Sequence, residues 1–423
     1  MDRLLVTGGT RLAGQVSVSG AKNSALKLMA AALLAPGRCT ISRVPRIQDC
    51  RTMGEVLEHM GLGVSWEGDR VTIDASEVTS VEAPYELVRR MRASIVVLGP
   101  LLARCGEARV ALPGGDNIGT RPIDLHLKGL ERMGAEIGME HGFLHARARR
   151  LQGTAITLDY PSVGATENLL MAAVAARGTT VLDNAAREPE IADLAAFLAS
   201  MGARIAGAGS STIEIEGVAS FAPADHATIP DRIEAGTFAM AAVATQGDVE
   251  LIGARTDHLE LALMKLADMG AQVDLTEAGV RIRQADRARA VDFVTLPYPG
   301  LATDFQPLMM AVLATAAGTS IATENVFDSR FLYVDELVRM GADVRTEGHH
   351  AVIRGVERLS AAPVRALDIR AGAAMVVAAL SADGVTEVSD VHHVDRGYED
   401  FEAKLTALGA EVRRERELIP TRP

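Results

Sequence analysis

The sequence predicts an α/β protein of two domains, each built from three copies of one repeating unit. Two landmarks recur along the chain. The helix-end pattern L-x-x-(M/L)-G-(A/L)-x-(V/I) occurs six times, with glycines 73, 68, 68, 71 and 68 residues apart at positions 61, 134, 202, 270, 341 and 409. An Ala-rich helical run that ends in glycine precedes a short strand of β-branched residues in each unit. Such a period over the whole chain indicates one supersecondary unit copied six times.

Each unit reads as a buried helix, a strand, a more polar helix with a glycine stop, and one or two further strands. The runs 25–34 and 373–380 are apolar on nearly every side, which predicts helices buried all round. The glycines that follow the buried helices suit the left-handed conformation that closes a helix, and they stand at 37, 106, 178, 247, 318 and 384.

The length of the chain predicts where its domains divide. Six units of about 70 residues exceed one ordinary core, so three units a domain is the economical arrangement. A polar stretch at 224–231 separates the third unit from the fourth, and the segment before residue 20 contains a spare strand at 16–18 that we expect to complete a sheet of the second half. We therefore expect one domain of residues 21–229 and another of residues 1–20 plus 230–423.

Composition excludes several classes of function. The net charge of -12 disfavours a nucleic-acid partner, although a few convergent arginines still bind small anions. The first residues lack the apolar segment of a signal peptide, and apolar runs such as 28–35 are too short for a membrane span. We expect a cytoplasmic protein without membrane insertion, and no obligatory protein partner is evident.

Cysteine and histidine spacing does not indicate a metal site. Three cysteines, Cys39, Cys50 and Cys105, form no C-x-x-C pair, and each is expected to be a small buried hydrophobe. The doublets at 349–350 and 392–393 lack H-x-x-x-H spacing, and adjacent side chains diverge on a strand. We expect neither a metal nor an organic cofactor.

Charged residues stand where the buried helices begin, and they are the candidates for chemistry. Lys22 and Asn23 open the first such helix, where a lysine either binds an anion or is merely solvated. Of Arg89, Arg90 and Arg92 at the second helix, Arg92 is our choice because it is nearest the apolar run. Other candidates at matching positions are Ser162 to Asn168, where Thr166 is an alternative as an ordinary N-cap, then Asp304, and Asp368 with Arg370. Arg396 stands later in the sixth unit. Convergence of these groups suits an anionic substrate.

The stretch from Leu112 to Arg121 is the candidate for a mobile lid. It places Asp116 between glycines at 114, 115 and 119. Glycines let a loop approach a ligand closely, and the loop carries one carboxylate and one guanidinium. The alternative is a surface turn with a solvated aspartate.

The motifs together resemble the UDP-N-acetylglucosamine 1-carboxyvinyltransferase family of enolpyruvyl transferases over nearly the whole chain. They are Ser19 to Asn23, Met91 to Ser94, Leu112 to Gly115, Arg121 to His126, Ser162 to Asn168, Asn184 to Glu190, Asp231 to Thr237, Thr303 to Gln306, Arg339 to Ala342 and Asp395 to Tyr398. The resemblance implies two inside-out α/β barrels of three units each, with the active site between them. It implies transfer of the enolpyruvyl group of phosphoenolpyruvate to the 3′-hydroxyl of UDP-N-acetylglucosamine by addition and elimination, with release of phosphate, in the first committed step of peptidoglycan synthesis.

The resemblance also implies roles for individual residues. Lys22, Arg92, Arg121 and Arg396 correspond to residues around phosphoenolpyruvate, and Asn23 lies near the reacting centre. Arg121, Pro122, Ile123, Asp124 and Leu125, with Ser162, Val163 and Gly164, resemble the uridine diphosphate site. Asp304 and Val326 resemble contacts to the sugar, with Asp304 the candidate base for its hydroxyl. Asp368 and Arg370 complete the expected substrate-binding set.

The lid departs from the common family pattern, because Asp116 stands where many members have cysteine. A minority of the family has Asp here. The residue is thought to protonate the methylene carbon of phosphoenolpyruvate, so a carboxyl in this place needs its proton near neutral pH. We expect Asp116 to be protonated only in the closed, ligand-loaded site. We also expect resistance to fosfomycin, which alkylates the thiolate of the Cys form, because a carboxylate is a much weaker nucleophile.

Three alternatives stay open from the sequence. The shikimate-pathway enolpyruvyl transferase shares the six-unit architecture. A relative recruited to secondary metabolism would modify another nucleotide, and Tyr160 and Pro161 stand where relatives often have a basic residue. A catalytically silent scaffold for nucleotide sugars is the third alternative, although Lys22, Asp304 and Arg396 are all present.

Overall fold

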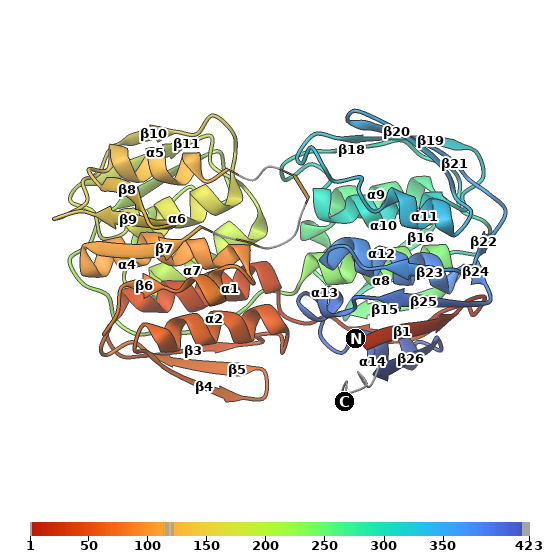
Figure 1. Cartoon of the computed structure of the whole chain (residues 1–423), viewed down its shortest axis with the longest axis horizontal. Helices are drawn as coiled ribbons and strands as arrows, with labels where there is room; N and C mark the ends of the chain where they lie inside the picture. The colour runs from red at the N-terminus through yellow and green to blue at the C-terminus, as the bar shows by residue number, and fades with distance from the viewer. Residues whose placement is uncertain (1, 113, 115–117, 120–121, 417–423) are drawn as a thin grey trace, which may run out of the picture. The chain divides into compact units, whose positions relative to one another are not determined.

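A computed structural model describes residues 2–112, 114, 118–119 and 122–416. The predicted lid residues Asp116 and Arg121 lie outside the described residues. The chain forms two compact units (Figure 1). Among the described residues, the inserted unit comprises 20–112, 114 and 122–229, and the flanking unit comprises 2–19, 118–119 and 230–416.

The inserted unit carries three four-stranded sheets of one design. In each, a short strand pairs in parallel with the strand that follows a buried helix, and a hairpin continues the sheet in antiparallel order. The sheets are β14-β3-β5-β4, β6-β7-β9-β8 and β10-β11-β13-β12. Their strands are β3 (Arg38–Ser42), β4 (Gly63–Glu67), β5 (Arg70–Asp74), β6 (Glu82–Ala83), β7 (Glu107–Ala111), β8 (Glu136–Glu140), β9 (Phe143–Arg147), β10 (Ala155–Thr157), β11 (Thr179–Asp183), β12 (Arg204–Ala206), β13 (Thr212–Glu216) and β14 (Asp225–Ala227).

The flanking unit repeats this design, but segments from both ends of the chain complete it. Its four-stranded sheets are β16-β17-β15-β2, β18-β19-β21-β20 and β23-β25-β1-β26, with a small β22-β24 pair. Their strands are β1 (Asp2–Thr7), β2 (Ala13–Ser17), β15 (Asp248–Ile252), β16 (Gln272–Thr276), β17 (Gly279–Arg283), β18 (Phe293–Thr295), β19 (Thr319–Glu324), β20 (Asp343–Glu347), β21 (His350–Arg354), β22 (Leu359–Ser360), β23 (Pro363–Arg365), β24 (Ala382–Asp383), β25 (Val385–Ser389) and β26 (Glu411–Arg416). The expected spare strand is β2, which pairs in parallel with β15.

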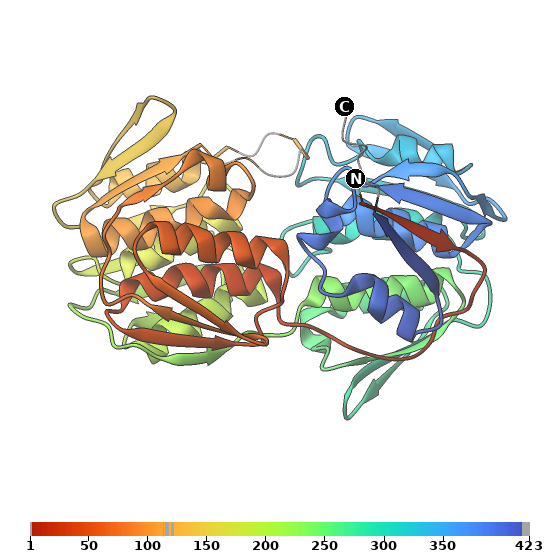
Figure 2. The same ribbon diagram turned by 60° about the horizontal axis from the view of Figure 1, so that its bottom comes forward.

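Helices fill the centre of each unit and the sheets lie outside them (Figures 1 and 2). The inner helices of the inserted unit are α1 (Lys22–Ala31) with η1 (Ala32–Leu34), α4 (Leu98–Cys105) entered through α3 (Tyr85–Val88) and η2 (Arg92–Val97), and α6 (Val163–Ala173). Those of the flanking unit are α8 (Arg232–Ala244), α10 (Gln306–Leu313) entered through η4 (Thr303–Phe305), and α12 (Ile369–Leu380). The remaining helices are α2 (Gln48–His59), α5 (Asp124–Arg132), α7 (Pro189–Ser200), η3 (Thr256–His258), α9 (Glu260–Asp268), α11 (Val334–Arg339), α13 (His392–Asp395) and α14 (Phe401–Ala407).

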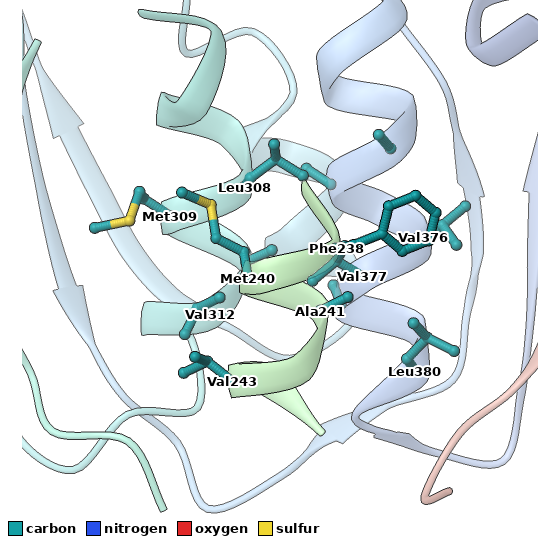
Figure 3. Packing of buried hydrophobic residues seen from close by; sticks show 14 of the residues in the cluster. Phe238, Met240, Ala241, Val243, Leu308, Met309, Val312, Val376, Val377 and Leu380 are labelled. Atoms are coloured by element: carbon teal, nitrogen blue, oxygen red, sulfur yellow. The ribbon is translucent and has the colours of Figure 1, made fainter. Parts of the chain in front are cut away.

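The inner helices of each unit are buried on nearly all sides. Every residue of α12 is buried, and in α1 only Asn23 is more than slightly exposed. In the flanking unit, Phe238 of α8, Met309 of α10 and Val376 of α12 belong to one apolar cluster (Figure 3). The helices predicted to be buried on all sides are therefore confirmed, and the predicted α/β fold of repeated units is confirmed with them.

Backbone conformation confirms the six-fold repeat. All six glycines of the helix-end pattern have a left-handed φ between 91° and 105°. One glycine of the second set departs from the prediction. Gly247 has no positive φ, because the preceding residue, Gln246, takes the left-handed position with a φ of 51°.

Two smaller predictions were wrong. Cys39 and Cys50 are buried, but Cys105 is exposed because it ends α4 at the unit surface. His392 and His393 lie in the short helix α13 rather than on a strand, and their ring centroids are 4.2 Å apart. None of the helices in the described part of the chain has both the length and the apolar character that a membrane span requires.

Candidate functional site

Lys22 is the first residue of α1, and it is buried against a carboxylate. Its side chain is 8% exposed, and Nζ lies 2.8 Å from Oδ2 of Asp49 on α2. The alternative of a solvated lysine is therefore wrong. Asp49 escaped the sequence analysis, since nothing in its local sequence shows that α2 brings it to the start of α1.

The arginine cluster before α4 divides into two surface residues and one less exposed residue. Arg89 and Arg90 are exposed and pair with Glu86 at 2.9 Å and with Glu55 at 3.3 Å. Arg92 begins η2 and is half-buried. Of the three, Arg92 is thus the least exposed.

His126 on α5 is a buried residue that the sequence analysis did not select. Its Nδ1 accepts a hydrogen bond of 2.8 Å from Nδ2 of Asn168, which places the ring proton on Nε2. Burial, then the positive charge of Arg92, lowers the pKa of His126 to about 4, against a small opposing effect of Asp124. The imidazole is therefore neutral at physiological pH.

The predicted uridine segments meet at this histidine. Gly164 lies so close to the ring that an added Cβ would stand 3.1 Å from Cε1 of His126, so the position favours glycine. Ser162 is the N-cap of α6 and accepts from the backbone N–H of Ala165 at 3.3 Å. Val163 follows it, half-buried. The alternative N-cap, Thr166, instead accepts from the N–H of Ala186.

The other segment of the predicted uridine site leads into α5. Pro122 is exposed, whereas Ile123, Asp124 and Leu125 are half-buried just before His126. The structure thus brings residues 122–126 together with residues 162–164. Arg121, which belongs to the same predicted set, lies outside the described residues.

In the flanking unit, Asp304 lies between two arginines. Its Oδ2 is 3.0 Å from Nε of Arg370, and its Oδ1 is 3.7 Å from Nη2 of Arg330. Burial raises the pKa of Asp304, but the charges of Arg370, Arg330 and Arg232 outweigh it and bring the pKa down to about 2. The carboxylate is therefore ionised at any working pH.

A buried glutamate joins the segments of Asp304 and Val326. Glu324 ends β19 and is 1% exposed. Its Oε2 accepts from the hydroxyl of Thr303 at 3.0 Å, and its Oε1 accepts from the backbone N–H of Val326 at 2.8 Å. Glu324 and Arg330 are further residues of this group that the sequence analysis missed.

The remaining candidates lie at the ends of α12 and α13. Asp368 is the N-cap of α12 and accepts from the backbone N–H groups of Arg370 and Ala371 at 2.7 and 3.0 Å. Its carboxylate therefore orients the residue that holds Asp304. Arg396 follows α13 and is half-buried, while the neighbouring Asp395 is taken up by Arg414 at 2.7 Å.

The predicted residues that the structure describes are divided between the two units. Lys22, Asn23, Arg92, residues 122–126 and residues 162–164 belong to the inserted unit. Asp304, Val326, Asp368, Arg370 and Arg396 belong to the flanking unit. Cationic side chains beside carboxylates are suited to an anionic substrate that carries a hydroxyl, because charge-assisted hydrogen bonds are stronger than those between neutral groups.

Comparison with known proteins defines the class. Residues 6–405 match the family of EPSP synthase (3-phosphoshikimate 1-carboxyvinyltransferase). The crystal structure of the enolpyruvyl transferase NikO from Streptomyces tendae superimposes with a TM-score of 0.89 at 29% identity, covering 98% of each chain. EPSP synthase from Acinetobacter baumannii shares the fold, with a TM-score of 0.76 at 18% identity over 98% of this chain and 100% of that one. The fold is that of the enolpyruvyl transferases.

The sequence relatives narrow the class. The UDP-N-acetylglucosamine 1-carboxyvinyltransferase of Corynebacterium jeikeium is 56% identical over 413 residues, and that of Mycobacterium tuberculosis is 53% identical over 413 residues. In both comparisons 98% of this chain and 99% of the relative are covered. The chain belongs to the UDP-N-acetylglucosamine 1-carboxyvinyltransferase family of enolpyruvyl transferases.

Proposed function

We propose that this protein transfers the enolpyruvyl group of phosphoenolpyruvate to the 3′-hydroxyl of UDP-N-acetylglucosamine and releases phosphate. The observation that carries the proposal is identity above 50% over the full length of transferases with that name. The reaction would be the first committed step of peptidoglycan synthesis, and we place it in the cytoplasm. Both groups of site residues act on the same pair of substrates in this proposal.

The chemistry proceeds by addition and elimination. The sugar oxygen bonds to C2 of phosphoenolpyruvate while the methylene carbon gains a proton and becomes a methyl group. A proton then leaves this methyl group as the C2–O bond to phosphate breaks, which restores the double bond. We assign the first proton to Asp116, and the anionic groups of phosphoenolpyruvate to Lys22, Arg92, Arg121 and Arg396.

We propose that Asp304 orients the sugar hydroxyl and takes its proton only as the oxygen attacks. A carboxylate with a pKa of about 2 is a weak base, so it gives little driving force for removing a proton from a free hydroxyl. The ionised carboxylate is nevertheless a strong hydrogen-bond acceptor, and Arg370 and Arg330 hold it in position. Proton transfer that accompanies C–O bond formation fits these properties.

We further propose that the protein resists fosfomycin. The drug inactivates family members by alkylating a cysteine thiolate in the lid, and Asp116 stands at that position. A carboxylate attacks an epoxide far more slowly than a thiolate does.

Phosphate release from phosphoenolpyruvate tests the main proposal. UDP-N-acetylglucosamine, UMP and shikimate 3-phosphate are offered in parallel, with Lys22→Met as an inactive control. Release with UDP-N-acetylglucosamine alone is expected. Release with UMP alone would indicate a relative recruited to modify another nucleotide, and Tyr160 would then be a residue to test. Release with shikimate 3-phosphate alone would indicate the EPSP synthase reaction. If phosphate is released with none of the three acceptors, the protein is better explained as a catalytically silent scaffold that binds nucleotide sugars.

A further inference from the structure

A second buried lysine of α1 lies one turn beyond the predicted site residues. The side chain of Lys27 is 9% exposed, and its Nζ donates to the backbone carbonyl of Asn23 at 2.8 Å. The same Nζ lies 3.4 Å from Oε1 of Glu167 on α6, whose side chain is 1% exposed. Lys27 therefore connects the first turn of α1 to a neighbouring inner helix.

The beginning of α1 has little local support of its own. Its N-cap is Ala21, which offers no side-chain cap, and no acidic residue lies in the first turn. It is held instead by distant groups: the N–H of Ala21 donates to the carbonyl of Ile229 at 2.7 Å, and the hydroxyl of Ser24 donates to Asp193. The bond from Lys27 to the Asn23 carbonyl lies within α1, and the contact of Lys27 with Glu167 joins this turn to the distant helix α6.

Glu167 lies among charged groups on two elements. Lys27 of α1 faces it as the cation, while Glu188 and Glu190 at the start of α7 are near enough to affect its ionisation. Burial raises the pKa of Glu167 to about 7, Lys27 opposes this, and the two glutamates add to it. The charge that attracts Lys27 therefore changes near neutral pH.

We propose that the Lys27–Glu167 pair is a positioning device that holds the first turn of α1, and with it Asn23 and Lys22, in place for the substrates. The role of these residues toward substrate rests on the proposed function. The restraint itself rests on the contacts described above. Lys27 and Glu167 are positioning residues, because they act through α1.

Hydrogen exchange and kinetics together test the proposal in the full-length protein. In Lys27→Met we expect faster exchange of the backbone N–H groups of residues 24–27, and a 10- to 100-fold loss of kcat/KM for phosphate release with UDP-N-acetylglucosamine. In Glu167→Gln we expect near-normal kcat/KM at pH 6 and a threefold or greater loss above pH 8, because only the ionised carboxylate pairs with Lys27. Lys27→Arg keeps the charge and should restore most of the activity.

A comparable ion pair supplies the control for a general loss of stability. In the flanking unit, Nζ of Lys404 lies 2.6 Å from Oε1 of the buried Glu234. Lys404→Met should lower the melting temperature without altering exchange in residues 24–27 or the pH profile. Should Lys27→Met fold poorly, the double variant Lys27→Met with Glu167→Gln removes the uncompensated charge and should recover stability but not activity.

Unchanged exchange in residues 24–27 of Lys27→Met would overturn the proposal, as would activity that merely follows the melting temperature across all variants. Failure of the wild-type protein to release phosphate with any of the three acceptors would refute the proposed function instead. The exchange measurement would still decide whether Lys27 holds the turn.

Discussion

The carboxylate of Asp304 illustrates how neighbouring charges restrict the chemistry of one residue. It is placed by η4, and Arg370 and Arg330 keep it ionised although it is partly buried. A general base with a pKa near the working pH would show its ionisation in the pH dependence of the reaction. Asp304 has a pKa too low for that.

We predict that Asp304→Asn lowers kcat/KM by about 100-fold or more, within the range that general bases contribute. The loss should be the same at every pH between 5 and 9, because Asp304 is ionised throughout this range. Phosphate release measured across the range checks the prediction. A wild-type acidic limb with a midpoint between 5 and 6 that is absent from Asp304→Asn would contradict it.

We predict that fosfomycin leaves the wild-type protein active and inactivates Asp116→Cys with time. A cysteine at this position provides the thiolate that an epoxide alkylates. Residual activity after preincubation with the drug, together with the mass of the protein, measures the effect, and Cys105→Ala in the same background shows that the exposed cysteine is not the target. Rapid inactivation of the wild-type protein would refute the prediction.

At the residue level, sequence analysis found groups that stand at helix starts but missed their partners. Lys22 and Asp304 are visible because each stands at the start of an otherwise apolar helical run. Asp49 and Arg330 are recognisable only after the fold brings α2 to α1 and the segment after β19 to η4. A charge pair between distant segments leaves no local pattern in the sequence.

At the level of elements, α5 and α6 each contribute one buried titratable side chain, His126 and Glu167. Their ionisation changes the free energy of unfolding with pH in opposite directions. The pKa of His126 is lowered to about 4, so the unfolded chain binds more protons between pH 4 and 6.5 and stability rises with pH there. The pKa of Glu167 is raised to about 7, so the folded chain binds more protons between pH 4.5 and 7 and stability falls. The two effects offset one another.

We predict that substituting His126 or Glu167 singly reveals the pH dependence of stability that the other residue causes. In Glu167→Gln the stability of the inserted unit should rise by about 3 kcal/mol from pH 4 to 6.5, and in His126→Gln it should fall by about 3 kcal/mol from pH 4.5 to 7. Urea unfolding followed by fluorescence measures this, because the single tryptophan, Trp66, lies in β4 of the inserted unit. The double variant serves as the control and should show neither slope. Parallel pH profiles for the wild type and both single variants would contradict the prediction.

Element boundaries were predictable where glycine ends a helix and less so where caps come from polar side chains. The six glycine stops have the same left-handed geometry, so the repeat was readable. The start of α6 was ambiguous, because Ser162 and Thr166 both have a hydroxyl that could cap the helix. Only the fold shows that Ser162 is the N-cap and that the Thr166 hydroxyl accepts a hydrogen bond from the N–H of Ala186. At Gly247 the left-handed position shifted by one residue, which a count of glycines does not reveal.

At the level of the whole molecule, the number of units followed from the sequence, but the order of strands did not. Among the six four-stranded sheets of the described residues, five contain a local hairpin and four take their outer parallel strand from just before the inner helix, but the remaining strands come from elsewhere in the chain. In the inserted unit β14 pairs with β3, so Asp225 stands opposite Thr40. In the flanking unit β1 lies between β25 and β26, a central place that a spare N-terminal segment gave no reason to expect.

This pairing predicts that the two units respond differently to loss of the first strands. Deletion of residues 2–18 removes β1 from the middle of one flanking-unit sheet and β2 from the edge of another. It also removes Leu4 and Val6, which are 1% and 0% exposed. The inserted unit keeps all of its strands and its own apolar cluster.

We expect the variant to retain a cooperative urea-unfolding transition in Trp66 fluorescence, while its circular dichroism loses about half of the native helical signal. Substitution of the exposed Arg11 by Ala is the matched control and should leave both signals unchanged. Loss of the cooperative Trp66 fluorescence transition in the deletion variant would show that the inserted unit depends on the flanking unit to fold, and a fully native spectrum would show that β1 and β2 are dispensable.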